Sequence, residues 1–220
     1  MEIVRLRAHE VEKDSASWTI STEERRELYK TVAMALDKID DSVGAYKIML
    51  LFMNQLEKAS DAEISEAAPQ ARRCIILAIK SKNAINFDEL LALKAVKLLE
   101  SKDAEVFKFL TLFTTTDAQD FKGQVSKFQS IMTKENLSMD DVITKKSYLQ
   151  ICSLSTQTTN YTYSDLSKLL NIAEDDIEEW AIEAIQNKII DAKIDQLNSE
   201  IIIKSHKMRE IKKKEWEAIQ

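Results

Sequence analysis

The chain has 220 residues, of which 45% are hydrophobic and 31% charged, and its formal net charge is −6. This composition is typical of a globular protein, and two glycines and one proline are too few for a sheet-rich fold, whose turns need these residues. The acidic balance gives no general attraction to phosphate backbones or anionic membranes. No apolar run approaches the roughly 20 residues that span a bilayer. We therefore expect a mainly α-helical, intracellular protein.

The first part of the chain predicts a succession of short helices. Residues 1–14 form one amphipathic turn and helix. Ser21 and Glu24 have the spacing of a capping box, in which each side chain bonds the backbone amide of the other residue. The helix that follows places apolar residues on one face: Leu28, Val32, Leu36 and Ile39.

The next helix, from about 43 to 58, is apolar nearly all round and needs neighbours on several sides. A helix over about 70–80 has Pro69 in its first turn, where a missing amide costs least. Asp88 is predicted to cap a short helix.

Further helices are expected over about 96–99, over 104–113 and after Thr116. The last of these carries four apolar residues at helical spacing: Phe121, Val125, Phe128 and Met132. Short helices joined by short loops predict antiparallel pairs stacked as a right-handed helical-repeat domain over residues 1–137.

The pattern changes after Ser138, which is predicted to cap a helix that reaches about residue 155. A β-prone run over 161–163 precedes a helix from Ser164 to Leu170. An amphipathic helix then places six residues on one face: Ile177, Trp180, Ala181, Ala184, Ile185 and Ile189. Two β-prone segments follow, 192–195 and 200–204. Helix, strand, helix, helix, strand, strand is the order of a winged helix, which we assign to residues 138–207. Residues 208–220 then begin a C-terminal helix.

The sequence predicts neither catalysis nor a bound cofactor or metal. Its two histidines, His9 and His206, fall in different predicted domains, and no metal-binding spacing is present. Two glycines exclude a phosphate-binding loop. Adjacent acids occur near predicted helix ends and point about 100° apart, so they do not form an acid/base pair. Cys74 and Cys152 lie in apolar helical stretches and are expected to be buried thiols.

The second helix of the winged helix is too acidic to read DNA. Residues 174–189 carry six carboxylates against one lysine, Lys188, whereas DNA-binding proteins neutralise phosphates with Lys and Arg. A basic run follows: Lys204, His206, Lys207, Arg209, Lys212, Lys213 and Lys214. It is either a contact for RNA or an acidic partner, or the solvated face of a helix whose other side carries Met208, Ile211, Trp216 and Ile219.

A helical stack followed by an acidic winged helix resembles the PCI domain family. Residues 71–100 and 166–206 narrow the resemblance to the subunit M family of eukaryotic translation initiation factor 3. Three stretches carry most of it: Arg73-Cys74-Ile75, Phe87-Asp88-x-Leu90-Leu91-x-Leu93-Lys94 and Lys193-Ile194-Asp195-Gln196. The resemblance covers about residues 20–220. It implies that the family continues beyond residue 220 into a helix that joins a multi-subunit bundle.

The resemblance implies a non-catalytic scaffold subunit in the cytoplasm, whose partners are other subunits of the initiation factor and, through the complex, the small ribosomal subunit. Members of the family associate through their winged helices. The expected wing strand, residues 200–204, would offer an unpaired edge to a neighbour, or be covered by the C-terminal helix. Because strand residues alternate sides, Ile201, Ile202 and Ile203 cannot all face the core. The expected interface residues are Ile194, Ile201, Ile202, Ile203, Lys204, Met208, Ile211 and Trp216.

Two alternatives remain at this point. The chain could be a PCI subunit of the related signalosome or proteasome lid. It could also be a winged-helix regulator that binds nucleic acid through a surface other than the acidic helix 174–189.

Overall fold

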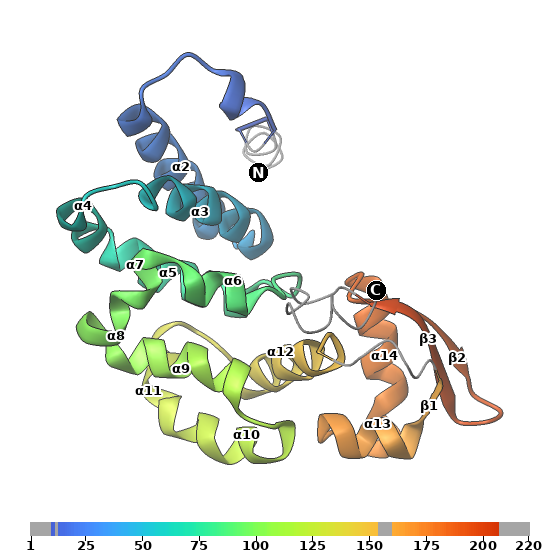
Figure 1. Cartoon of the computed structure of the whole chain (residues 1–220). Coiled ribbons are helices and arrows are strands. Elements are labelled where there is room, and N and C mark those ends of the chain that lie inside the picture. Colours follow the sequence, from blue (N-terminus) through green and yellow to red (C-terminus); the bar gives the residue numbers. More distant parts are fainter. Residues whose placement is uncertain (1–9, 12, 154–159, 207–220) are drawn as a thin grey trace, which may run out of the picture. The chain divides into compact units, whose positions relative to one another are not determined.

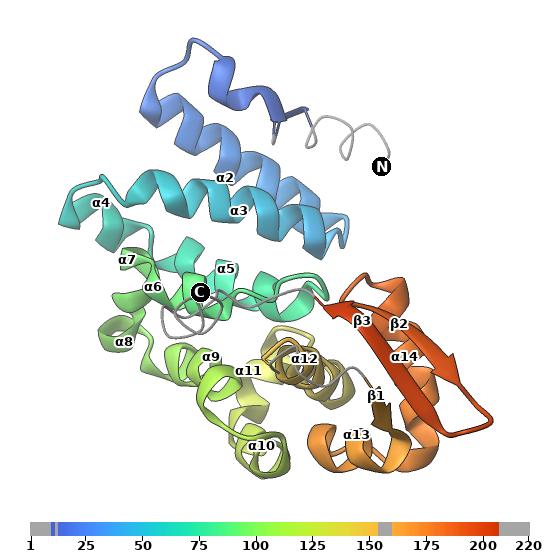
Figure 2. The same cartoon turned by 45° about the vertical axis from the view of Figure 1, so that its right-hand side comes forward.

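A computed structural model of the chain describes residues 10–11, 13–153 and 160–206. It is mainly helical with one small sheet, so the predicted fold class is confirmed (Figures 1 and 2). The chain divides into two compact units, Met1–Thr111 and Leu112–Gln220, and the division falls within a helix. The domain limits expected from the sequence, 1–137 and 138–207, stay a prediction. No helix in the described part of the chain has the length and apolarity needed to cross a membrane.

The first unit is a series of helices that follow one another in short steps (Figure 1). Its elements are η1 (Ser15–Ser17), α2 (Thr22–Lys38), α3 (Ser42–Leu56), α4 (Asp61–Glu66), α5 (Ala68–Lys80), α6 (Phe87–Ala92), α7 (Lys94–Lys97), α8 (Leu99–Lys102) and α9 (Ala104–Thr115), of which α9 continues into the second unit.

The helix starts in this unit follow local rules. The predicted capping box of α2 is confirmed, because the Ser21 amide donates to Glu24 Oε2 at 2.8 Å and the Glu24 amide donates to Ser21 Oγ at 3.1 Å. Pro69 occupies the first turn of α5, as predicted. The prediction for Asp88 was wrong. This residue lies inside the first turn of α6, which begins after Asn86.

The core of the first unit is formed by α3 and α5, whose side chains are buried on several sides. In α3 the buried residues are Ala45, Tyr46, Ile48, Met49, Phe52, Met53 and Leu56. Cys74 lies in the buried part of α5, and its burial raises the pKa of the thiol to about 12, as in an unreactive core thiol. Cys152 in the second unit is also buried.

Several polar links in the first unit join residues 36 or 37 positions apart, whereas Arg72 and Asp103 pair across 31 positions. Arg73 holds Asp37 with two hydrogen bonds of 2.6 Å, from Nε to Oδ2 and from Nη2 to Oδ1. Arg26 pairs with Glu63 across 37 residues. Further links of the same separation join Lys94 to Glu57 and Lys102 to Ser65. The recurrence of this separation in four links means that equivalent points of successive helix pairs lie side by side, which supports the stacked repeat.

The second unit begins with the end of α9 and three short elements, and these are followed by a winged helix that contains the sheet (Figure 2). Its elements after α9 are α10 (Ala118–Val125), η2 (Ser126–Phe128), α11 (Gln129–Lys134), α12 (Met139–Ile151), β1 (Asn160–Thr162), α13 (Tyr163–Leu170), η3 (Glu174–Asp176), α14 (Ile177–Gln186), β2 (Ile190–Asp195) and β3 (Glu200–His206).

The predicted order of elements in the winged helix is confirmed, and several boundaries differ. Ser138 caps α12, but this helix ends at Ile151. The expected long helix after Thr116 is broken into α10, η2 and α11. The N-cap of α13 is Thr162 rather than Ser164, because the Thr162 hydroxyl accepts from the Asp165 amide at 3.1 Å. Thr162 still has extended backbone, as an N-cap requires.

The three strands form an antiparallel sheet in the order β1-β3-β2. Ile202 of β3 lies opposite Asn160 of β1 and Lys193 of β2, and Ile201 lies opposite Tyr161 and Ile194. A bulge interrupts the β2–β3 register next to Asp191. The strand β3 is therefore the central strand of the sheet.

Helices end without glycine, since the chain has only two. Four residues that follow helices adopt left-handed backbone, with φ between 54° and 60°: Asp40, Asn136, Asn171 and Lys188. Each is followed by an amide that reaches back five residues, for example Ile189 N to Ala184 O at 2.9 Å, as in a Schellman motif. Asn and Asp tolerate this conformation, whereas lysine has no such compensation.

Replacing Lys188 with glycine should therefore stabilise the protein. Glycine removes the steric cost of the left-handed conformation, and part of the gain is lost to its greater freedom in the unfolded chain, so we expect a net increase of about 1 kcal/mol in the free energy of unfolding. Urea unfolding of Lys188→Gly against the parent measures it. The matched change Asn171→Gly should give a smaller gain, and equal gains at both positions would contradict this account.

Acid should weaken the start of α4. Hydrogen bonds from the backbone amide and hydroxyl of Ser60, and then from Arg26, lower the pKa of Glu63 from 4.5 to about 2. A depressed carboxyl pKa gives stability that is complete above the ordinary value and is lost as the pH falls through the folded value. The parent should therefore lose stability relative to Glu63→Gln between about pH 5 and pH 2.

Urea midpoints of the two proteins measured across this pH range give the test. Ser60→Ala removes the hydroxyl and keeps the amide, so its pH dependence should be intermediate. Parallel pH profiles for the parent and Glu63→Gln would refute the role of this capping carboxylate.

Candidate protein-interaction surface

A buried polar link fixes α14 within the second unit. The indole Nε1 of Trp180 donates to Ser147 Oγ at 2.7 Å, and this hydroxyl donates to the carbonyl of Thr144 at 2.7 Å. The rings of Trp180 and Tyr148 are tilted, with centroids 6.2 Å apart. The indole thus packs in the core while its N–H is satisfied. The helix α14 is therefore held in one orientation against α12.

Lysine takes part in the same core. Lys146 of α12 is buried, and its ammonium donates to the carbonyl of Phe113 at 3.1 Å. This carbonyl belongs to the last turn of α9, where a cation interacts favourably with the helix dipole. The ammonium also lies 5.8 Å from the centre of the Phe121 ring. A lysine at this position looks solvent-facing in the sequence, and only tertiary contacts reveal its burial.

Glu178 connects α14 to the β2–β3 hairpin. Its Oε1 accepts from Gln196, which directly follows β2, and its Oε2 accepts from the hydroxyl of Tyr163 at 3.4 Å. Burial and then the adjacent Glu178 carboxylate raise the pKa of Tyr163. One face of α14 is thereby turned toward the end of β2.

The three consecutive isoleucines of β3 alternate as predicted. Ile201 is 0% exposed and Ile203 is 6% exposed, so both face the interior. Ile202 is half-buried on the opposite side of the sheet. Ile202 is therefore the isoleucine of the three that lies on the outer face.

The expectation that β3 offers the unpaired edge was wrong. β1 pairs with Glu200, Ile201 and Ile202 on one side of β3, and β2 pairs along the other side. β1 lies directly before α13, in a run that the sequence predicts to be β-prone. Its pairing with β3 was not predicted. Among the described residues, β2 pairs only with β3, so its other edge carries backbone groups without a strand partner.

An apolar strip lies beside this edge. Ile182 and Ile185 follow Glu178 at i+4 and i+7, so they share the side of α14 that Glu178 turns toward β2. Ile182 is 44% exposed and Ile185 is half-buried. On the inner side of β2, Ala192 and Ile194 are also half-buried. We call these four residues and the outer edge of β2 the β2 surface.

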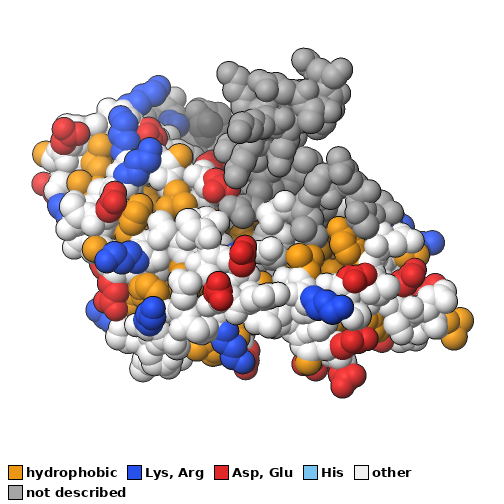
Figure 3. All heavy atoms as spheres, turned by 60° about the horizontal axis from the view of Figure 1, so that its bottom comes forward, with side chains coloured by type: hydrophobic (Ala, Val, Ile, Leu, Met, Phe, Trp, Pro, Cys, Tyr) orange, Lys and Arg blue, Asp and Glu red, His pale blue; other side chains and the backbone are white. Residues whose placement is uncertain are grey.

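The surroundings of the β2 surface are acidic. Residues 174–204 contain nine Asp or Glu and three Lys. All three residues of η3 are exposed acids, and so is Glu179 in α14. On the face shown in Figure 3, acidic side chains gather over the part of the second unit that holds α13 and α14. Phosphate is repelled by such a surface.

The expected interface residues fall into three groups. Ile194, Ile202 and Lys204 are accessible, and Lys204 Nζ lies 3.9 Å from Asp191 Oδ1 across the strands. Ile201 and Ile203 belong to the core. Met208, Ile211 and Trp216 lie outside the described residues. Ile182 was missed, because it stands just beside the strongest apolar stripe of its helix.

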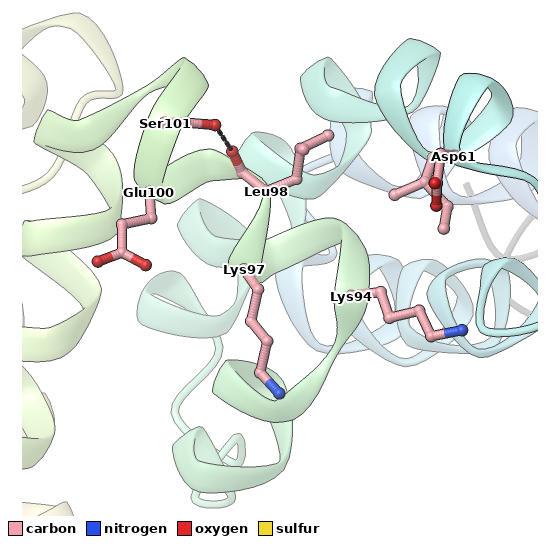
Figure 4. A pocket seen from close by; sticks show the side chains of 7 residues that line it. Asp61, Lys94, Lys97, Leu98, Glu100 and Ser101 are labelled. Carbon is pink, nitrogen blue, oxygen red and sulfur yellow. Dashed lines mark hydrogen bonds between the residues drawn. The ribbon is translucent and has the colours of Figure 1, made fainter.

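A separate groove of about 540 Å³ lies in the first unit. Its lining residues are Asp61, Ile64, Lys94, Lys97, Leu98, Glu100 and Ser101. Figure 4 shows that Asp61 and Glu100 lie on opposite sides of the view and do not point toward each other. The groove therefore brings no pair of acids together for proton transfer. In the described part of the chain no group of three potential ligands is placed to hold a metal ion.

Comparison with known proteins finds similarity at two levels. Residues 119–205, all within the second unit, match the model of the PCI domain. Proteins named eukaryotic translation initiation factor 3 subunit M are similar along most of the chain. Identity is 28% for the Nematostella vectensis protein, 26% for the Dictyostelium discoideum protein and 25% for the human protein.

These alignments cover 91%, 98% and 96% of the chain, respectively. They cover 52%, 54% and 55% of the relatives, so the chain spans about half the length of the curated relatives that it matches. Residues 119–205 are therefore similar to the PCI domain, and the chain as a whole is similar to proteins named subunit M of eukaryotic translation initiation factor 3.

Proposed function

We propose that the protein is a non-catalytic scaffold subunit of the eukaryotic translation initiation factor 3 complex. The observation that carries this proposal is similarity to subunit M along 91–98% of the chain. As part of that complex it would act in the cytoplasm and reach the small ribosomal subunit through neighbouring subunits. The buried polar side chains of the second unit also fit a scaffold. Trp180 and Lys146 use their polar groups to join one helix to another.

The β2 surface is the proposed assembly site of the winged helix. An edge strand can be continued by the strand of a neighbour, whose backbone groups then pair with those of β2. The exposed side chain of Ile182 and the half-buried side chain of Ile194 would be covered at the same time, which adds a hydrophobic contribution of about 25 cal/mol per Å² buried. This replaces the edge first expected on β3.

A related complex is the nearest alternative. A PCI subunit of the signalosome or the proteasome lid would use the same kind of edge, so geometry does not separate these assemblies. Similarity to proteins named subunit M favours the initiation factor. Mass spectrometry of proteins that co-purify with the full-length subunit separates them, because ribosomal and ubiquitin-pathway proteins identify different complexes.

Glutamates at Ile182 and Ile194 should disrupt assembly. Both replacements put a carboxylate where a partner would exclude water, and an unpaired buried charge is strongly unfavourable. Co-purification of the full-length double variant with other initiation factor subunits should fall by about tenfold or more. Because Ile182 is 44% exposed, the single variant Ile182→Glu should change circular dichroism and thermal unfolding little and should still lose co-purification, whereas Ile194 is half-buried on the inner side of β2 and its replacement also costs stability.

The matched control is Met34→Glu. Met34 is 48% exposed, close to the 44% of Ile182, but lies on α2 in the first unit. It should keep normal co-purification. Normal incorporation of a well-folded Ile182→Glu variant, alone or with Ile194→Glu, would end the proposal that β2 is the assembly edge. Charged replacements at Ile201 or Ile203 would test folding instead, since both are in the core.

The scaffold and the nucleic-acid regulator predict different affinities for a DNA or RNA duplex. The acids of η3 and α14 should keep the affinity for duplex DNA or RNA weaker than about 10⁻⁴ M at physiological salt. Fluorescence anisotropy with a labelled duplex at several salt concentrations measures this affinity. Micromolar binding with a steep salt dependence would favour the regulator over the scaffold.

A further inference from the structure

We draw no further inference here: the strongest candidate, the groove of the first unit between α4, α7 and α8, carries acids and lysines together along its rim, so that its charge selects no class of partner, and nothing in the structure shows what covers it.

Discussion

The pairing of β3 on both of its edges determines how the winged helix can meet another polypeptide. β1 occupies one side of β3 and β2 the other, so the backbone groups at the centre of the sheet are satisfied within the chain. The outer edge of β2 has no strand partner among the described residues. The β2–β3 hairpin therefore offers one edge to a partner, the outer edge of β2. Apolar side chains of α14 lie beside this edge.

The position of α14 depends on a few polar contacts in a mostly apolar interior. The Trp180–Ser147 hydrogen bond fixes the buried side of the helix, and Glu178 fixes the side that meets the hairpin. Because both contacts are held at once, α14 cannot rotate without leaving a buried indole N–H unsatisfied, which costs about 1–3 kcal/mol. Ile182 and Ile185 are thereby kept next to β2. The edge and the strip behave as one surface for this reason.

In other proteins the same winged-helix architecture binds nucleic acid. In this chain the acidic charge of η3 and α14 favours a protein partner over nucleic acid. Reading a groove requires a basic helix, and α14 with η3 is acidic over its exposed face. The first unit is held together in a different way. Its links between residues 36 or 37 apart tie successive helix pairs together, so that stability comes from repeated neighbour contacts.

The sequence by itself determined the elements whose signals are local. Capping at Ser21 and Ser138, the proline in the first turn of α5, and the alternation of Ile201, Ile202 and Ile203 all depend on neighbouring residues, and each was predicted correctly. The acidic character of residues 174–189 was also readable, since charge needs no fold.

Only the tertiary structure decided which strand is central, which lysines are buried and which isoleucine of α14 is exposed. Strand order depends on β1, which lies about forty residues before β3 in the chain. The burial of Lys146 depends on a carbonyl of α9, thirty-three residues away. Such pairings between distant segments leave no periodic signal in the sequence, because they are set by how the whole unit excludes water and satisfies its backbone.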